Sequence, residues 1–138
     1  MTFAEQKFLQ RNQLPDSYLA MAKEWFHPLL TDISQRAQVS EGPQVVFING
    51  SQGSGKSTLA DYLCTSTAEQ QGSQCVALSL DDFYLTREQR IELARDVHPL
   101  LATRGVPGTH DIPLAMATIK SLIMGQDETL ITRFDKST

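Results

Sequence analysis

Residues 50–57 read GSQGSGKS, and they follow the apolar run VVFI at residues 45–48. The octapeptide fits the pattern G-x-x-x-x-G-K-[ST] of a phosphate-binding loop, which connects a strand to a helix. The run at 45–48 is too short for a helix and is typical of a strand buried on both faces of a parallel sheet. After the loop, apolar residues recur at helical spacing from Leu59 to Ala68, and Gly72 is a stop signal. The stretch therefore predicts a strand, a phosphate loop and a helix in that order.

The glycines of this loop explain how it would bind an anion. They allow a tight turn that aims backbone N–H groups inward, and the positive end of the following helix dipole adds to their field. The lysine would reach the β- and γ-phosphates of ATP, and the serine hydroxyl after it would be a ligand of Mg²⁺. We therefore expect the nucleotide to contact Gly50, Ser51, Gln52, Gly53, Ser54, Gly55, Lys56, Ser57 and Thr58.

The loop pattern alone establishes neither phosphate binding nor the reaction. The same residues could form a glycine-rich turn that carries a lysine by accident. A phosphate loop also does not identify the reaction, because molecular switches, motors and kinases all use one.

Upstream of the loop, the sequence predicts helices. Apolar residues recur every three or four positions from Asp16 to about Ala37, with Pro28 as a candidate kink, and the polar stretch 40–43 ends the pattern. Residues 1–42 therefore predict a helical extension, and residues 43–138 predict part of a P-loop domain.

Downstream, a second apolar run at residues 75–80 predicts another buried strand, which ends in Asp81 and Asp82. Ligands of open α/β sheets bind at the carboxyl ends of the strands. One carboxylate could accept the proton of an acceptor hydroxyl, while the other, or the same one, positions Mg²⁺. A solvated turn at a strand end is the alternative, since Asp is common there.

The rest of the chain predicts two more helices and a short strand. A Thr86–Gln89 capping box opens a helix over 86–97, and a long loop covers 98–112. A helix over 113–124 should bury Leu114, Ala115, Ile119, Leu122 and Ile123, and residues 129–133 are a strand candidate. The fold class predicted is α/β, a parallel sheet of the P-loop NTPase type with flanking helices.

Composition narrows the partners. The 138 residues are 41% hydrophobic and 20% charged, as in one globular domain, and a formal charge of −4 argues against binding to nucleic acid or an acidic membrane. Cys64 and Cys75 lack metal-ligand or redox-motif spacing and are too few for a secreted disulfide framework. No apolar run is long enough to span a membrane. We expect a cytoplasmic protein.

The segment SLDDFYLT at residues 79–86 resembles the acceptor-site motif of the uridine kinase, phosphoribulokinase and pantothenate kinase superfamily. Within it, the chain is most similar to D-glycerate 3-kinase and its bacterial and fungal kinase-like relatives. The likeness runs from about Leu14 to the last residue and includes the phosphate loop, RGVPGTHD at 104–111 and RFDKS at 133–137. SLDDFYLT and RGVPGTHD are the more specific segments, because many families share the phosphate loop.

The resemblance implies roles for individual residues. Asp81 would be the catalytic base and, with Ser57, a Mg²⁺ ligand, while Lys56 would neutralise the transferring phosphoryl group. The acceptor would contact Asp82, Tyr84, Arg104, His110, Asp111 and Arg133.

Simpler roles are available for several of these residues. Asp111 could cap the next helix, and His110 could be a surface loop residue. The cations Arg104, Arg133 and Lys136 would suit a carboxylate-bearing acceptor such as glycerate or pantothenate, but not uridine. As isolated residues they would be solvated charges.

Members of this family are longer, and their additional segment supplies a strand with a second acidic residue, a lid and much of the adenine pocket. We therefore expect this chain to be a fragment that catalyses poorly alone and self-associates through exposed sheet edges.

The expected function is ATP-dependent phosphorylation, with Mg²⁺, of a hydroxyl on a small organic acid, with D-glycerate as the first candidate. A kinase of a nucleoside or of pantothenate, and a non-catalytic nucleotide-binding or assembly module, are the alternatives.

Overall fold

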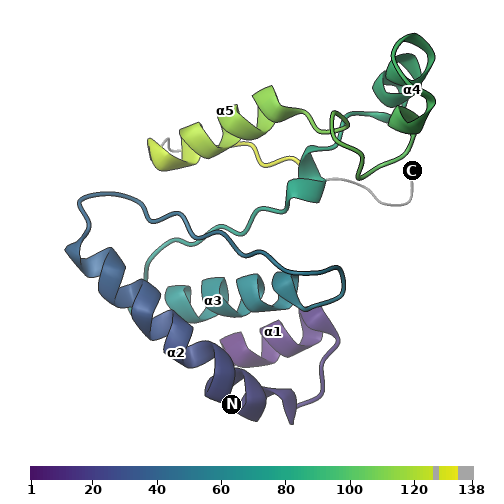
Figure 1. Ribbon diagram of the computed structural model, residues 1–138. Helices are drawn as coiled ribbons and strands as arrows, with labels where there is room; N and C mark the ends of the chain where they lie inside the picture. Colours follow the sequence, from purple (N-terminus) through teal and green to yellow (C-terminus); the bar gives the residue numbers. More distant parts are fainter. Residues whose placement is uncertain (126–127, 134–138) are drawn as a thin grey trace. The chain divides into compact units, whose positions relative to one another are not determined.

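The computed structural model describes residues 1–125 and 128–133, and the contacts of the chain separate into two units, Met1–Ala77 and Leu78–Thr138 (Figure 1). Each unit is considered by itself. The domain boundary after residue 42 stays a prediction. Self-association through exposed sheet edges also stays a prediction.

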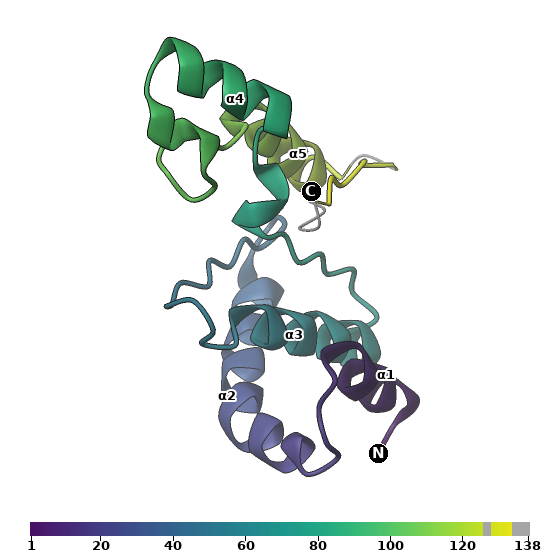
Figure 2. The same cartoon turned by 90° about the vertical axis from the view of Figure 1, so that its right-hand side faces the viewer.

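The first unit consists of three helices: α1 (Phe3–Asn12), α2 (Tyr18–Val39) and α3 (Lys56–Gln71). Both α1 and α2 pack against α3, which lies between them in Figure 2. Helix α1 begins with a reciprocal capping box between Thr2 and Glu5. Helix α3 ends at Gly72, whose left-handed conformation (φ 62°) lets its N–H bond to the Ala68 carbonyl, as the stop signal predicted. Helix α2 continues through Pro28.

Aromatic side chains form much of the core of this unit. Phe8 is 1% exposed, and its ring meets that of Tyr62 edge-on with 5.5 Å between centroids. The Phe26 ring also packs against Tyr62, with 5.5 Å between centroids. Leu9, Leu19 and Ala22 complete the buried cluster. The N-terminal helices are thus joined to the helix that follows the phosphate loop by a shared apolar core.

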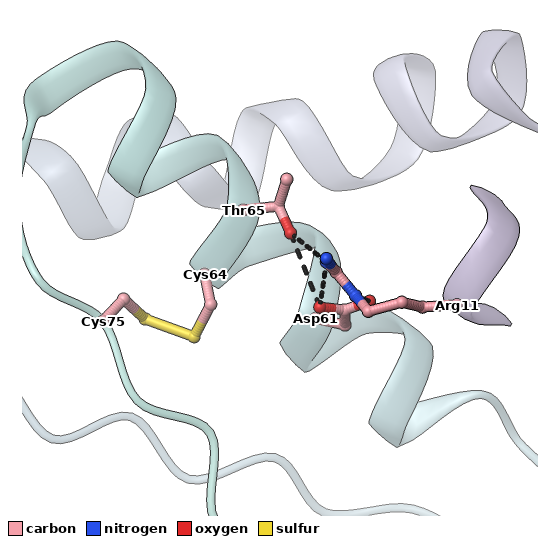
Figure 3. The surroundings of a disulfide bond; sticks show 5 residues. All are labelled: Arg11, Asp61, Cys64, Thr65 and Cys75. Atoms are coloured by element: carbon pink, nitrogen blue, oxygen red, sulfur yellow. Dashed lines mark hydrogen bonds and ion pairs between the residues drawn. A yellow bond between two sulfur atoms is a disulfide. The ribbon is translucent and has the colours of Figure 1, made fainter. Parts of the chain in front are cut away.

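A disulfide between Cys64 and Cys75 joins α3 to the segment after it (Figure 3). This pairing is not predictable from the sequence, because a separation of 11 residues matches no redox or metal motif.

The described residues form no parallel sheet, so this part of the α/β prediction is not confirmed and stays a prediction. Residues 43–50 and 73–79 run without regular secondary structure, as do residues 128–133. In the described part of the chain, no backbone hydrogen bond joins residues 45–48 to another segment, and Phe47 is 87% exposed. The physical reason is that a strand exists only when a neighbour supplies the ladder bonds, whereas an apolar run indicates only that a segment suits burial.

The second unit contains η1 (Leu80–Phe83), α4 (Arg87–Asp96), η2 (Pro99–Ala102) and α5 (Ile112–Ile123). The predicted second strand is replaced at its end by the 3₁₀ turn η1, because the Ser79 side chain caps that turn. The predicted Thr86–Gln89 capping box is confirmed at the start of α4. Helix α5 was predicted at nearly the right residues. Its packing differs, since Ala115 is buried but Leu114 and Ile123 are exposed.

Among the described residues, no helix is both long and apolar enough to cross a membrane.

The core predicts that Phe8→Ala destabilises the first unit strongly, because it removes a buried ring and leaves a cavity beside Tyr62. We expect a loss of about 3 kcal/mol in the free energy of unfolding, measured by urea denaturation followed by circular dichroism. Phe3→Ala is the matched control on the same helix, since Phe3 is 72% exposed. Equal losses for the two variants would contradict this assignment of the core.

Candidate functional site

The glycine loop has the turn geometry that its sequence predicted. Gly53 and Gly55 adopt positive φ angles of 76° and 86°, a region that side-chain-bearing residues rarely occupy. The Ser54 amide donates to the Ser51 carbonyl at 3.3 Å and so closes the turn. A Cβ added at Gly50 would lie 2.8 Å from Ser54 Oγ, so a side chain there would displace the Ser54 hydroxyl.

The beginning of α3 has no side-chain cap. Gly55 is the N-cap residue and offers no oxygen, and the first turn carries no acidic residue. Side-chain oxygens of Thr2, Thr86 and Asp111 accept backbone N–H bonds at the starts of α1, α4 and α5, whereas α2, like α3, has no side-chain cap. The first N–H groups of α3 therefore have no side-chain acceptor of this kind, and together with the helix dipole they suit an anion.

Lys56 adds a positive charge to this loop. Its ammonium group donates to the carbonyls of Gly50 at 2.9 Å and Ser51 at 2.7 Å, which folds the side chain back over the loop. Gln52 and Ser57 are exposed, and Thr58 is half-buried in the same first turn of α3. The donor set of amides, one ammonium group and hydroxyls fits the phosphates of a nucleotide, and the Ser57 hydroxyl is an oxygen ligand of the kind that Mg²⁺ takes.

The second candidate site lies in the second unit, where the segments 83–85 and 109–111 run side by side. The Leu85 amide donates to the Thr109 carbonyl at 2.9 Å, and the Asp111 amide donates to the Phe83 carbonyl at 2.6 Å. Tyr84 and His110 form the bridge between the segments, and their rings stack with 4.3 Å between centroids. The structure thus brings together the two motifs, SLDDFYLT and RGVPGTHD, that carry the resemblance.

The phenol of Tyr84 connects the site residues electrostatically. Its pKa is raised above the usual value of 10.0, first by burial and then by the charge of Asp81 and a hydrogen bond to that carboxylate. The positive charge of Arg104 acts in the opposite direction, as does that of Arg90. Asp81, Arg104 and His110 are therefore all neighbours of Tyr84.

The two adjacent carboxylates have different surroundings. Asp82 Oδ2 accepts from the Ser79 amide at 3.3 Å and pairs with the Arg133 guanidinium at 2.7 Å. The Asp82 side chain is 13% exposed and that of Arg133 is 60% exposed. Asp82 is thus held by the capping turn and an arginine, whereas Asp81 lies beside a phenol.

Asp111 performs the simpler of its two predicted roles. Its carboxylate accepts from the Leu114 amide at 2.9 Å and caps α5. His110 is more than a surface loop residue, since it is half-buried against Tyr84. Lys136, also considered for the acceptor, lies outside the described residues.

Sequence reasoning missed two residues that hold the second site together. Arg90 is 5% exposed and donates to the carbonyls of Leu85 at 3.2 Å and Ala102 at 2.8 Å, which ties α4 to the SLDDFYLT segment and to η2. Thr109 is fully buried, and its hydroxyl donates to the Val106 carbonyl at 2.6 Å. Neither has a sequence signal, because Arg90 stands in a helix that is polar on most sides and Thr109 in an irregular loop.

The phosphate loop belongs to the first unit and the Asp81 cluster to the second. A joint site with Ser57 and Asp81 as Mg²⁺ ligands therefore stays a prediction. Within the described residues, no group of three or more His, Cys, Asp or Glu side chains is placed to hold a metal ion.

The environment of Tyr84 predicts a specific titration. A raised pKa means that the folded state favours the neutral phenol, so this contribution to stability is complete below pH 10 and is lost as the pH rises through the raised pKa. We expect Asp81→Asn to lower the pKa of Tyr84 but not to restore it fully, because burial persists. Absorbance at the phenolate wavelength, with Tyr84→Phe as the reference, measures this. Asp96→Asn is the control, and an unchanged titration in Asp81→Asn would contradict the contact.

The comparisons with known proteins point to kinases. Residues 29–88 match the model of the family described as Zeta toxin. The chain is 43% identical over 98 residues to the uncharacterized kinase mug58 of Schizosaccharomyces pombe, covering 69% of this chain and 35% of that protein. It is 34% identical over 104 residues to the probable ATP-dependent kinase TDA10 of Saccharomyces cerevisiae, covering 69% and 36%. It is 38% identical over 104 residues to the chloroplastic D-glycerate 3-kinase of Arabidopsis thaliana, covering 69% and 22%.

A solved structure agrees with these relatives. The structure of the YGR205w protein superimposes with a TM-score of 0.65 at 28% identity, over 89% of this chain and 43% of that one. This chain spans between about a fifth and a little over a third of the curated relatives. The family model and the solved structure support the P-loop NTPase class of fold, and the relatives' names support a kinase in general. The chain is similar to one part of such kinases.

Proposed function

We propose that this chain carries the phosphate loop and the acceptor site of an ATP-dependent kinase that phosphorylates a hydroxyl group of a small organic acid. The observation that carries the proposal is the uncapped start of α3 behind a glycine loop, with Lys56 folded over that loop. The relatives named as kinases support it.

The phosphate loop would act by position and charge. Its amides would meet the phosphates of ATP without rearrangement because the loop is already folded, and the Lys56 ammonium group would exchange its two loop carbonyls for phosphate oxygens. Ser57 and Asp81 would hold Mg²⁺, which when bound supplies further neutralisation of the transferring group. The rest of the chemistry is assigned to the second unit.

The oxygen of the acceptor hydroxyl would form the new bond to the γ-phosphorus, while the bond from that phosphorus to the ADP oxygen breaks. Asp81 would accept the proton that the hydroxyl loses. The Tyr84 phenol donates a hydrogen bond to this carboxylate and so orients it. The ring of His110 supports the phenol by stacking. On this basis we propose that His110 positions the phenol and does not transfer the proton.

The charges around Asp81 favour an acidic acceptor. Arg104 is exposed and acts on Tyr84, so its guanidinium can meet a carboxylate beside the reacting hydroxyl. Arg133 pairs with Asp82, so it would contribute mainly by holding that carboxylate. D-glycerate is the proposed acceptor, since it carries a carboxylate next to hydroxyl groups and one relative is named a D-glycerate 3-kinase.

Two other functions compete with this one. A kinase for pantothenate or a nucleoside would use the same phosphate loop with a different acceptor. A nucleotide-binding or assembly module would bind nucleotide without transferring phosphate, and the short coverage of the relatives makes that alternative worth testing.

The phosphate loop predicts that Lys56→Ala weakens ADP binding by about ten- to a hundredfold, as expected for loss of a charged hydrogen-bond donor. Isothermal titration with Mg·ADP on the 138-residue chain measures this. Lys7→Ala is the control, because Lys7 lies over the Phe3 ring on α1. Equal ADP affinities for the Lys56→Ala variant and the parent chain would contradict the assignment of this loop as the phosphate site.

Activity is best measured on the product of the complete reading frame, whatever its length, because this chain spans only part of its relatives. We expect D-glycerate to stimulate ATP consumption and Asp81→Asn to abolish the stimulation, while the affinity for ADP measured without Mg²⁺ changes less than about twofold. Arg104→Ala should raise the KM for glycerate about tenfold or more with a smaller effect on kcat.

Each alternative has its own outcome in this assay. If pantothenate or a nucleoside stimulates ATP consumption and glycerate does not, that compound is the acceptor in place of glycerate. ADP binding without stimulation by any of these would favour a non-catalytic module.

A further inference from the structure

We propose that Cys64 and Cys75 are a redox modification site, a reversible disulfide that fastens the segment 73–77 to α3. The two Cα atoms lie 5.0 Å apart, within the range that a disulfide spans without moving the backbone. Both residues belong to the first unit, so the pair is set by the packing of that unit alone. This proposal is independent of the phosphate-transfer reaction.

Helix α3 is held from another direction by polar contacts that oxidation does not change. The Arg11 guanidinium donates to Asp61 Oδ1 at 2.7 Å and to Thr65 Oγ1 at 2.9 Å, and the Asn12 amide donates to Asp61. Figure 3 shows the Arg11 contacts beside the disulfide, with Cys64 and Thr65 consecutive on the helix. Since α1 and the core fix α3, opening the disulfide should free the segment 73–77 and not the helix.

Most of the segment is exposed to solvent. Ser73, Gln74 and Val76 are exposed, and the segment follows the left-handed Gly72 without regular secondary structure. It leads along the chain to Asp81. The covalent bond therefore controls how firmly the stretch before the proposed catalytic carboxylate is attached to the helix that follows the phosphate loop.

The exposure of the two residues indicates the order of the chemistry. Cys75 is exposed and Cys64 is half-buried, so an external disulfide meets Cys75 first. The Cys75 thiolate attacks one sulfur of a small-molecule disulfide and expels one thiol. The Cys64 thiolate then attacks the Cys75 sulfur of the mixed disulfide and expels the second thiol. Two cysteine thiols are oxidised, and one external disulfide is reduced to two thiols.

Oxidised glutathione is the probe for this exchange, applied to the 138-residue chain after reduction with dithiothreitol. We expect the intact mass to fall by two hydrogen atoms with no glutathione retained, and dithiothreitol to reverse the change. Cys64→Ser should instead retain one glutathione on Cys75, because the resolving thiol is absent. A parent chain that keeps its reduced mass, or that accumulates stable glutathione adducts, would overturn the proposal.

Hydrogen exchange and thermal denaturation test the structural consequence. Reduction should speed amide hydrogen exchange in residues 73–77 and leave the exchange rates of α1 unchanged. It should also lower the melting temperature by at least about 5 °C, as expected for loss of a disulfide that closes a short loop. The variant with both Cys64→Ser and Cys75→Ser is the control, since its melting temperature should be the same with and without the oxidant. Identical hydrogen exchange in residues 73–77 of the oxidised and reduced parent chain would show that the disulfide does not hold this segment.

Discussion

The proposed phosphate site depends on the electrostatics of one helix end. Helix α3 begins at Lys56 without a side-chain cap or an acidic first turn, directly behind a loop whose glycines have positive φ angles. Unsatisfied N–H groups at a helix start need an acceptor, and side chains supply one at the starts of α1, α4 and α5. The Lys56 ammonium group, bonded to two loop carbonyls, adds a full positive charge to the same place. A bound phosphate would satisfy both features at once.

The remaining structure holds the two candidate sites in shape. In the first unit, Phe8 and Tyr62 join the N-terminal helices to α3, and the Arg11–Asp61 ion pair adds a polar contact on the helix surface. The predicted helical extension is therefore packed onto the helix that follows the phosphate loop. In the second unit, the buried Arg90 bonds to carbonyls beside each motif segment, which fixes the backbone on which Asp81 and Tyr84 stand.

Sequence patterns predicted the local features well and the long-range ones poorly. The phosphate loop, the Gly72 stop and the Thr86 cap depend on residues close in sequence, and each has the expected geometry. The strands depend on neighbours far along the chain, and residues 45–48 and 75–80 form none among the described residues despite their apolar composition. Arg90, Thr109 and the Cys64–Cys75 pair could not be found from periodicity, because each acts through a partner that only the folded backbone brings near. The motif resemblance did identify Tyr84, which interacts with Asp81, together with Arg104, whose charge acts on the Tyr84 phenol, and His110, which stacks on its ring.

The most direct test of the central claim is a titration of the ¹⁵N-labelled chain with inorganic pyrophosphate, followed by amide chemical shifts. The account predicts saturable shifts concentrated at residues 53–58, with little change at the capped starts of α1 and α4. Shifts spread over surface lysines and arginines, or no saturable shift in the loop, would contradict the claim that these amides form the phosphate site.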